Sequence, residues 1–224
     1  MTRNAILSGV VLIALLILGA GAWYVLQDDS AGPANAASVT AKAGFTLTPY
    51  DRALGSPKAP MLVMEYGAPT CPVCARFDMT VFPQFKKEWI DTGKAYYVFR
   101  TFPLSAVDVA AENIARCLPA DRYFSFIDLL YRNQAKWDPD GNVIPDVHGA
   151  LIQMAQLGGL SAAKADSCIQ DAAAQKRVAD SAKDAEKNYL IDHTPTIFAN
   201  GHEVDDAKDS YTTFNAALLA AQKK

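Results

Sequence analysis

The 224-residue sequence predicts an α/β domain that carries an all-helical insertion and follows one N-terminal transmembrane helix. Three observations lead to this fold class. An apolar strand pattern runs directly into Cys71-Pro72-Val73-Cys74 and a helical pattern. A second buried strand follows, which predicts a right-handed parallel crossover unit. Helical periodicity then continues through about residues 105–190, before a short hairpin and a last helix.

The N-terminal segment is apolar enough to be an anchor. Ala5 to Leu26 are 22 residues without a charge, with Arg3 before them. This length spans a hydrocarbon layer of ~30 Å, whereas the apolar core of a cleaved signal peptide has about 7–15 residues. We therefore expect residues 1–26 to be a transmembrane anchor, with a signal peptide cut near Ala36 as the alternative. Either way the remainder is exported, which predicts a periplasmic domain, held at the inner membrane if the anchor is retained.

The segment after the anchor is small and polar. Residues 27–44 predict a flexible linker, so the folded domain should cover residues 45–224. Residues 45–48 alternate like a short strand. Met61 to Tyr66 are nearly all apolar, as in a central strand that is covered on both faces, and Ala95 to Phe99 form a second such run.

Helical spacing marks the remaining elements. Apolar residues recur every four positions after the cysteines, at Phe77, Val81, Phe85 and Trp89. Pro83 lies inside this pattern and should kink the helix. Ser161 is expected to cap one long helix that turns Ala165, Cys168, Ile169, Ala172 and Ala179 inward. Asn200-Gly201 between two short apolar runs predicts a hairpin, and Asp209 or Ser210 should cap the last helix.

Composition excludes some classes of function. Half of the residues are hydrophobic and a fifth are charged, which is globular composition. The formal net charge of -3 argues against a nucleic-acid binder, which would show a basic face. No metal site is expected, because Cys117 and Cys168 are isolated while zinc ligands usually come in close pairs. No long heptad pattern precedes the catalytic domain, so a monomer is expected.

The chemistry points to Cys71 and Cys74. Two thiols three positions apart can close a disulfide that opens and recloses, because the second sulfur can resolve a mixed disulfide formed by the first. A helix N-terminus stabilises a thiolate there. Thr70 is the expected N-cap, and Pro72 suits the first turn, where no N–H is needed.

Glu65 interrupts the first central strand and allows two interpretations. A carboxylate on such a strand is costly unless it has a partner or a proton. It either points to a solvated sheet edge or lies buried beneath the cysteines and exchanges protons with Cys74.

Cys117 and Cys168 also allow two interpretations. Both fall on apolar helical stripes, so they are either two buried, inert thiols or a structural disulfide across the insertion. Export to an oxidising compartment favours the disulfide.

These residues together resemble a DsbA-like thiol–disulfide oxidoreductase of the thioredoxin superfamily. The resemblance covers Phe45 to the C-terminus and rests on the order strand, Cys-Pro-Val-Cys, kinked helix, strand, helical insertion, Thr-Pro, hairpin and helix. It implies a thioredoxin fold, with Glu65 as the buried acid. It also places the cis-proline of the family at Thr194-Pro195, where backbone groups hold the substrate chain.

The resemblance also implies the function. We expect a membrane-anchored oxidase without a bound cofactor that introduces disulfides into unfolded exported proteins. A quinone-linked membrane partner of the DsbB type would reoxidise it. Val73 departs from the best-known members, which carry a histidine there that stabilises the first thiolate, so strongly oxidising character stays open. His193 could replace that histidine only in part, and the simpler interpretation of His193 is a solvent-exposed loop residue. The alternatives are a reductase or isomerase, including one for haem-attachment cysteines, and a non-catalytic membrane adaptor.

Overall fold

A five-stranded sheet lies at the centre of the computed structural model, which describes residues 44–204 and 207–223. Its strands are β1 (Arg52–Leu54), β2 (Met61–Gly67), β3 (Ala95–Thr101), β4 (Thr196–Ala199) and β5 (His202–Glu203). They are ordered β1-β3-β2-β4-β5. The central pair β2 and β3 is parallel, whereas the other neighbours are antiparallel. The two predicted buried strands are therefore the central pair of the sheet.

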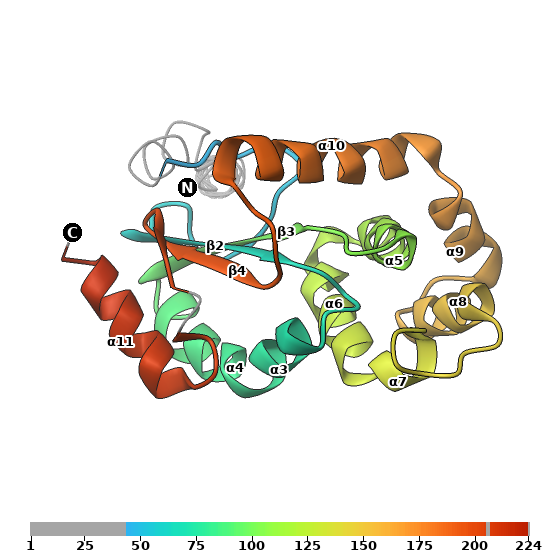
Figure 1. The fold of residues 1–224 in the computed structure, drawn as a ribbon, viewed down its shortest axis with the longest axis horizontal. Helices are drawn as coiled ribbons and strands as arrows, with labels where there is room; N and C mark the ends of the chain where they lie inside the picture. The colour runs from blue at the N-terminus through green and yellow to red at the C-terminus, as the bar shows by residue number, and fades with distance from the viewer. Residues whose placement is uncertain (1–43, 205–206, 224) are drawn as a thin grey trace, which may run out of the picture. The chain divides into compact units, whose positions relative to one another are not determined.

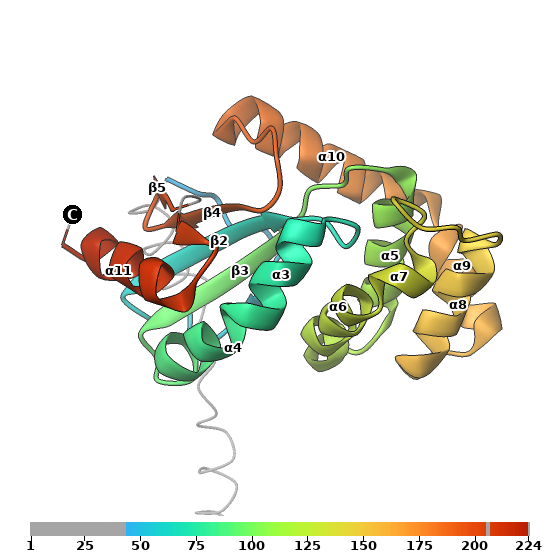
Figure 2. The same cartoon turned by 60° about the horizontal axis from the view of Figure 1, so that its bottom comes forward.

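Helices cover both faces of this sheet (Figure 1). On one face lie α3 (Pro72–Thr80), α4 (Phe82–Phe85), the π-helical turn Lys86–Ile90 and α11 (Tyr211–Ala221). The opposite face carries α10 (Ala172–Tyr189). The other helices gather at one end of the sheet (Figure 2): α5 (Ala106–Cys117), the 3₁₀ turn Ala120–Arg122, α6 (Tyr123–Arg132), α7 (Gln134–Trp137), α8 (Val147–Leu157) and α9 (Ala162–Ile169). Helices α5 to α10 make up the predicted all-helical insertion.

The side chains of β2 point alternately to the two faces of the sheet, and a separate hydrophobic core lies on each face. Successive side chains of a strand point to opposite faces, so Met61 and Val63 pack with α3, α4 and α11, whereas Leu62 and Met64 pack toward α10. All seven residues of β2 are buried, as predicted for a central strand.

The helix after the cysteines is interrupted, as its proline predicts. Helix α3 ends at Thr80 and α4 begins at Phe82, with Pro83 in its first turn. A proline in a helix interior would remove a backbone hydrogen bond and clash with the preceding turn, so the helix restarts instead. Its four predicted core residues are all buried, at Phe77, Val81, Phe85 and Trp89.

Two predictions of secondary structure were wrong. Residues 45–48 form no strand, because Arg100 of β3 holds them as irregular chain by donating to the Thr46 carbonyl group, and the edge strand is β1 instead. The helix that Ser161 caps ends at Ile169. Asp171 then caps α10 by accepting hydrogen bonds from two backbone N–H groups, so a second, separate helix begins there.

Because α10 is a separate helix, its buried face is not a continuation of the buried face of α9. Ala172 and Ala179, which were predicted to be buried, are exposed, and Ala174 and Val178 are buried in their place.

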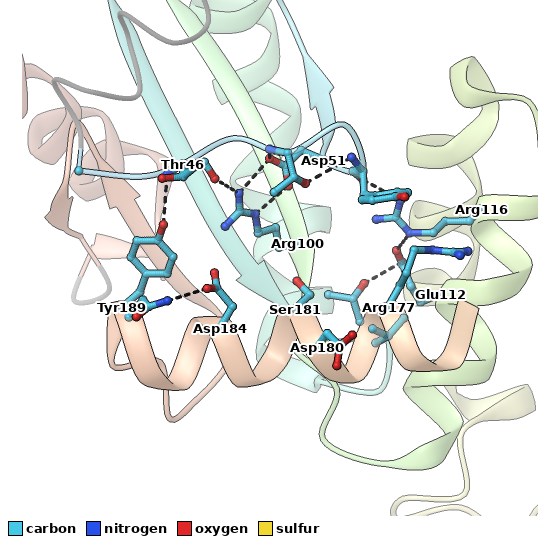
Figure 3. A pocket seen from close by; sticks show the side chains of 16 residues that line it. Thr46, Asp51, Arg100, Glu112, Arg116, Arg177, Asp180, Ser181, Asp184 and Tyr189 are labelled. Atoms are coloured by element: carbon cyan, nitrogen blue, oxygen red, sulfur yellow. Dashed lines mark hydrogen bonds and ion pairs between the residues drawn. The ribbon is translucent and has the colours of Figure 1, made fainter. Parts of the chain in front are cut away.

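Arg100 anchors the start of the described domain. It is buried, donates from Nε to Asp51 at 2.7 Å and from Nη1 to the Tyr66 hydroxyl at 3.0 Å. Figure 3 shows Arg100 and Asp51 on the wall of a cavity of about 640 Å³, between residues 44–51 and α10. Neither cysteine of the Cys-x-x-Cys motif lines this cavity. The pair therefore fixes residues 46–51 on the sheet, away from the predicted chemistry.

A disulfide joins Cys117, at the end of α5, to Cys168 in α9, with their Cα atoms 6.3 Å apart. It closes a loop across 51 positions and ties the first helix of the insertion, α5, to α9. In the part of the chain that the structure describes, no helix is both long and apolar enough to cross a membrane. The predicted anchor (1–26) and nearly all of the predicted linker lie outside the described residues.

We expect the variant Cys117→Ser/Cys168→Ser to lose about 4 kcal/mol of unfolding free energy, because the open loop gains conformational entropy in the unfolded chain. Urea denaturation followed by circular dichroism measures this. The matched control is Cys71→Ser/Cys74→Ser, which removes two thiols that are unpaired in the structure. A double variant that unfolds at the same urea concentration as the parent would contradict the prediction.

Candidate active site

Cys71 itself begins helix α3. It is the N-cap residue, and its Sγ accepts a hydrogen bond from the Cys74 backbone N–H at 3.2 Å. Pro72 takes the first helical position, where a missing N–H costs nothing. The prediction of Thr70 as the N-cap was wrong, because the backbone N–H and hydroxyl of Thr70 both donate to Asp108. The sulfur of Cys71 therefore lies where the helix presents its unpaired N–H groups.

The two cysteines differ strongly in acidity. Both are free thiols and buried, Cys74 completely. A hydrogen bond from the Cys74 side chain, with smaller contributions from the Thr194 side chain and from the N–H groups of Cys74 and Val73, outweighs burial and lowers the pKa of Cys71 to about 6. Burial, followed by the hydrogen bond and charge of Cys71 and the charge of Glu65, raises the pKa of Cys74 well above its ordinary value. One sulfur is thus a thiolate at neutral pH, and the other keeps its proton.

The loop before β4 lies against Cys71. The Thr194–Pro195 peptide bond is cis, and Cys71 Sγ lies 3.4 Å from the Thr194 carbonyl oxygen, to which the sulfur donates only while it is protonated. The structure thus places the Thr-Pro pair beside the first cysteine, although 123 positions separate them in the chain. His193 is half exposed, and its Nδ1 lies 2.7 Å from Asp192 Oδ1.

Glu65 lies on β2, between Phe99 of β3 and Ile197 of β4. It is 2% exposed, so the solvated-edge interpretation was wrong. The hydroxyl of Tyr97 donates to Glu65 Oε2 at 2.8 Å. The carboxylate is therefore buried on the sheet face that carries α3, close enough to act on Cys74 through its charge.

Glu65 borders a cavity of about 370 Å³ between α3 and α6, which Tyr97, Asp78, Asp128 and Tyr131 also line. The Tyr131 hydroxyl and Asp78 Oδ2 are buried without a hydrogen-bond partner among the described residues. Burial and the facing carboxyl group of Asp128 raise the pKa of Asp78 to about 7. Polar groups of this kind are satisfied by ordered water when the space is large enough, as it is here.

Two further residues near Cys71 were missed by the sequence reasoning. Asp108 is completely buried and binds Thr70, and Gln134 donates to the carbonyl groups of Pro69 and Cys71 at 2.8 and 3.1 Å. The spacing Ser105-x-x-Asp108 is a signal for a capping box and could have identified a fixed carboxylate there. Nothing in the sequence marks Gln134.

Comparison with known proteins agrees with this geometry. A protein-family model described as thioredoxin matches residues 47–219. The chain belongs to the thioredoxin family. The predicted thioredoxin fold with a helical insertion is thereby confirmed, and so is the resemblance to DsbA-like proteins.

Among curated relatives, a "Putative protein-disulfide oxidoreductase" of Rickettsia typhi is 32% identical over 75% of this chain and 62% of its own length. A Rickettsia bellii protein of the same name is 30% identical over 80% of this chain and 67% of its own. The chain thus spans about two thirds of the length of these relatives. Disulfide bond formation protein D of Bacillus subtilis is 25% identical over 70% of each chain.

Solved structures give the same result. The crystal structure of α-DsbA1 from Wolbachia pipientis has a TM-score of 0.69 and 26% identity, and the match covers 81% of this chain and 96% of that one. Oxidised BdbD from Bacillus subtilis has a TM-score of 0.66 at 21% identity, which shows a shared fold.

The acidity of Cys71 predicts how its reactivity depends on pH. In the reduced protein, the rate of Cys71 alkylation by iodoacetamide should rise through pH about 6, while Cys74 stays unmodified. Because the folded pKa lies below the unfolded one, ionisation of Cys71 stabilises the reduced protein fully above the unfolded pKa. This stabilisation is lost as the pH falls through about 6.

Mass spectrometry of protein quenched at each pH measures this profile, with Cys71→Ser as the control that should lack the fast reaction. A midpoint near the ordinary value of 9.0 would contradict the assignment.

Proposed function

We propose that this protein is a thiol–disulfide oxidoreductase that introduces disulfide bonds into exported proteins. The observation that supports it most is the unequal pair of sulfurs, with Cys71 ionised at the start of α3 and Cys74 buried and protonated behind it. Thiol–disulfide exchange needs a good leaving thiolate and a second sulfur that resolves the intermediate. The relatives named as protein-disulfide oxidoreductases support the same function.

The reaction starts from the Cys71–Cys74 disulfide. A substrate thiolate attacks Cys71 Sγ, which forms a mixed disulfide and breaks the bond to Cys74, whose sulfur leaves as a thiolate and takes up a proton. The second substrate thiolate then attacks the first substrate sulfur in the mixed disulfide, which forms the disulfide of the substrate and releases Cys71 as a thiolate. The substrate dithiol is oxidised, and the protein disulfide is reduced to the dithiol.

The acidity of Cys71 favours this direction. A substrate cysteine has a pKa near 8.5, so Cys71, with a pKa of about 6, is the better leaving group. Its value lies between those of thioredoxin, about 7, and DsbA, about 3.5. The structure therefore supports an oxidase that is milder than DsbA. The absence of histidine at Val73 agrees with this intermediate position.

Glu65 is proposed to supply and accept the proton of Cys74. Cys74 is completely buried, so bulk water cannot exchange its proton directly. The charge of Glu65 acts on Cys74, and the cavity that Glu65 borders gives the carboxyl group a route to water. Thr194 and Pro195 are proposed to hold the substrate chain, because the Thr194 carbonyl oxygen lies 3.4 Å from the reacting sulfur.

The proposed site of action is the periplasm, with the domain tethered to the inner membrane through residues 1–26. The apolar N-terminal run and the Cys117–Cys168 disulfide support an exported, oxidising setting. We propose a quinone-linked membrane oxidase of the DsbB type as the partner that regenerates the Cys71–Cys74 disulfide.

Oxidation of a reduced, unfolded model protein tests the function. The oxidised domain, residues 45–224, should form disulfides in this substrate stoichiometrically, and Cys71→Ser should abolish the reaction. Cys74→Ser should accumulate a mixed disulfide between Cys71 and the substrate, which non-reducing electrophoresis detects.

The proposal fails if Cys71→Ser retains substrate oxidation. Rapid reduction of substrate disulfides by the dithiol form, without any oxidation by the disulfide form, would identify a reductase instead. Partner binding that survives loss of both cysteines, with no electron transfer, would identify an adaptor.

The role of Glu65 predicts a kinetic defect. Glu65→Gln should slow disulfide exchange at pH 7 by about 10²-fold, because the Cys74 proton loses its nearby acceptor. The same change should lower the pKa of Cys74, because it removes a negative charge. Stopped-flow tryptophan fluorescence and alkylation of Cys74 in the Cys71→Ser background measure the two effects.

The control for Glu65→Gln is Tyr97→Phe, which removes the hydrogen bond to Glu65 and keeps the carboxyl group. Exchange at the parental rate in Glu65→Gln would show that another group carries the proton.

A further inference from the structure

The connection between β2 and α3 is held by residues of the helical insertion. Cys71 ends this connection, and its backbone N–H donates to the Ala68 carbonyl group at 3.0 Å. That turn leaves the N–H of Thr70 and the carbonyl group of Pro69 to be satisfied, whereas the Cys71 carbonyl group already accepts from the Ala75 N–H of α3 at 3.0 Å. Buried backbone groups almost always have partners, so their partners are informative.

Asp108 holds one side of the connection. Its Oδ1 accepts from the Thr70 backbone N–H at 2.8 Å and its Oδ2 from the Thr70 hydroxyl at 3.0 Å. The same carboxylate accepts from the N–H groups of Leu104 and Ser105 at 2.9 and 3.0 Å, and forms the capping box of α5 with Ser105. Asp108 is therefore held in place by α5 as well as bound to the connection between β2 and α3, residues 68–71, which we call the redox loop.

Gln134 holds the other side. Its Nε2 donates to the carbonyl oxygens of Pro69 and Cys71. Gln134 is the first residue of α7, and the last, Trp137, is completely buried and donates from its indole nitrogen to the Leu130 carbonyl group at 2.9 Å. The short helix is thus anchored on α6, which fixes the amide of Gln134.

We propose that the helical insertion positions the reactive sulfur: Asp108 and Gln134 clamp residues 69–71 from two sides, so that Cys71 Sγ stays in place to accept from the Cys74 N–H. Both are positioning residues, since neither contacts Cys71 Sγ in the structure. The bond that they protect is 3.2 Å long, so a small displacement of the N-cap residue weakens it. The inference rests on the proposed dithiol chemistry, but it concerns only the state of Cys71.

The matched variants are Gln134→Leu and Gln175→Leu. Gln134→Leu removes both hydrogen bonds without changing charge. Gln175 is also in the insertion and also donates from its side chain to a backbone carbonyl group, that of Ile169 at 2.7 Å, but it is exposed and has no hydrogen bond to the redox loop. It therefore controls for the loss of a side-chain amide as such.

The experiment measures the rate of iodoacetamide alkylation of Cys71 in the reduced full-length protein at pH 5 and pH 9. Gln134→Leu should lower the rate at pH 5 about threefold, the change expected for a rise of half a unit in the pKa of Cys71, and leave the rate at pH 9 unchanged. Gln175→Leu should match the parent at both pH values. An unchanged rate at pH 5, or an equal loss at both pH values, would overturn the inference, because each indicates a role other than thiolate stabilisation.

Asp108→Asn provides a second test, which serves also if Gln134→Leu does not fold. Here the direction of the change in the alkylation rate at pH 5 separates the two explanations. Loss of a negative charge lowers the pKa of a nearby thiol and so speeds alkylation at pH 5, an effect made smaller here because burial raises the pKa of Asp108. Release of the clamp should slow it, which is the result that we expect. Faster alkylation would contradict the proposal. Neither assay uses a protein substrate, so failure of the oxidase proposal would not be mistaken for failure of this one.

Discussion

The hydrogen bond from the Cys74 backbone N–H to Cys71 Sγ is the interaction on which the site depends. It exists because Cys71 is the N-cap residue of α3, where backbone N–H groups have no partner within the helix. Together with the stronger hydrogen bond from the Cys74 side chain, it lowers the pKa of Cys71, while burial raises the pKa of Cys74. The dithiol is therefore asymmetric before any substrate arrives.

The rest of the fold maintains that asymmetry. The parallel pair β2 and β3 places Glu65 and Tyr97 side by side beneath α3. Strand β4 pairs with β2 on its other edge and brings the cis Thr194–Pro195 bond to Cys71. Elements more than 120 positions apart in the chain thus meet at one sulfur, and burial keeps Cys74 protonated behind it.

Much of this arrangement could be predicted from sequence. The apolar run of β2, the spacing of the cysteines and the Asn200-Gly201 turn each have a local physical cause, and the structure has the central strand and the hairpin that were predicted. Glu65 stood out because a carboxylate on a buried strand is costly. The prediction of a strand at residues 45–48 was wrong because the hydrogen bonds of Arg100, which hold residues 46–51 as irregular chain, join segments about 50 positions apart. Gln134 could not be found, because an amide that binds backbone carbonyl groups leaves no pattern in the sequence.

The reduction potential of the Cys71–Cys74 pair, measured by equilibration with graded glutathione, tests the central claim most directly. Stabilisation of the Cys71 thiolate favours the reduced form and makes the disulfide more oxidising. The pKa of about 6 predicts a potential between about -270 mV, the value for thioredoxin, and about -120 mV, the value for DsbA. A potential at or below that of thioredoxin would contradict the pKa of about 6 for Cys71 and the assignment as an oxidase.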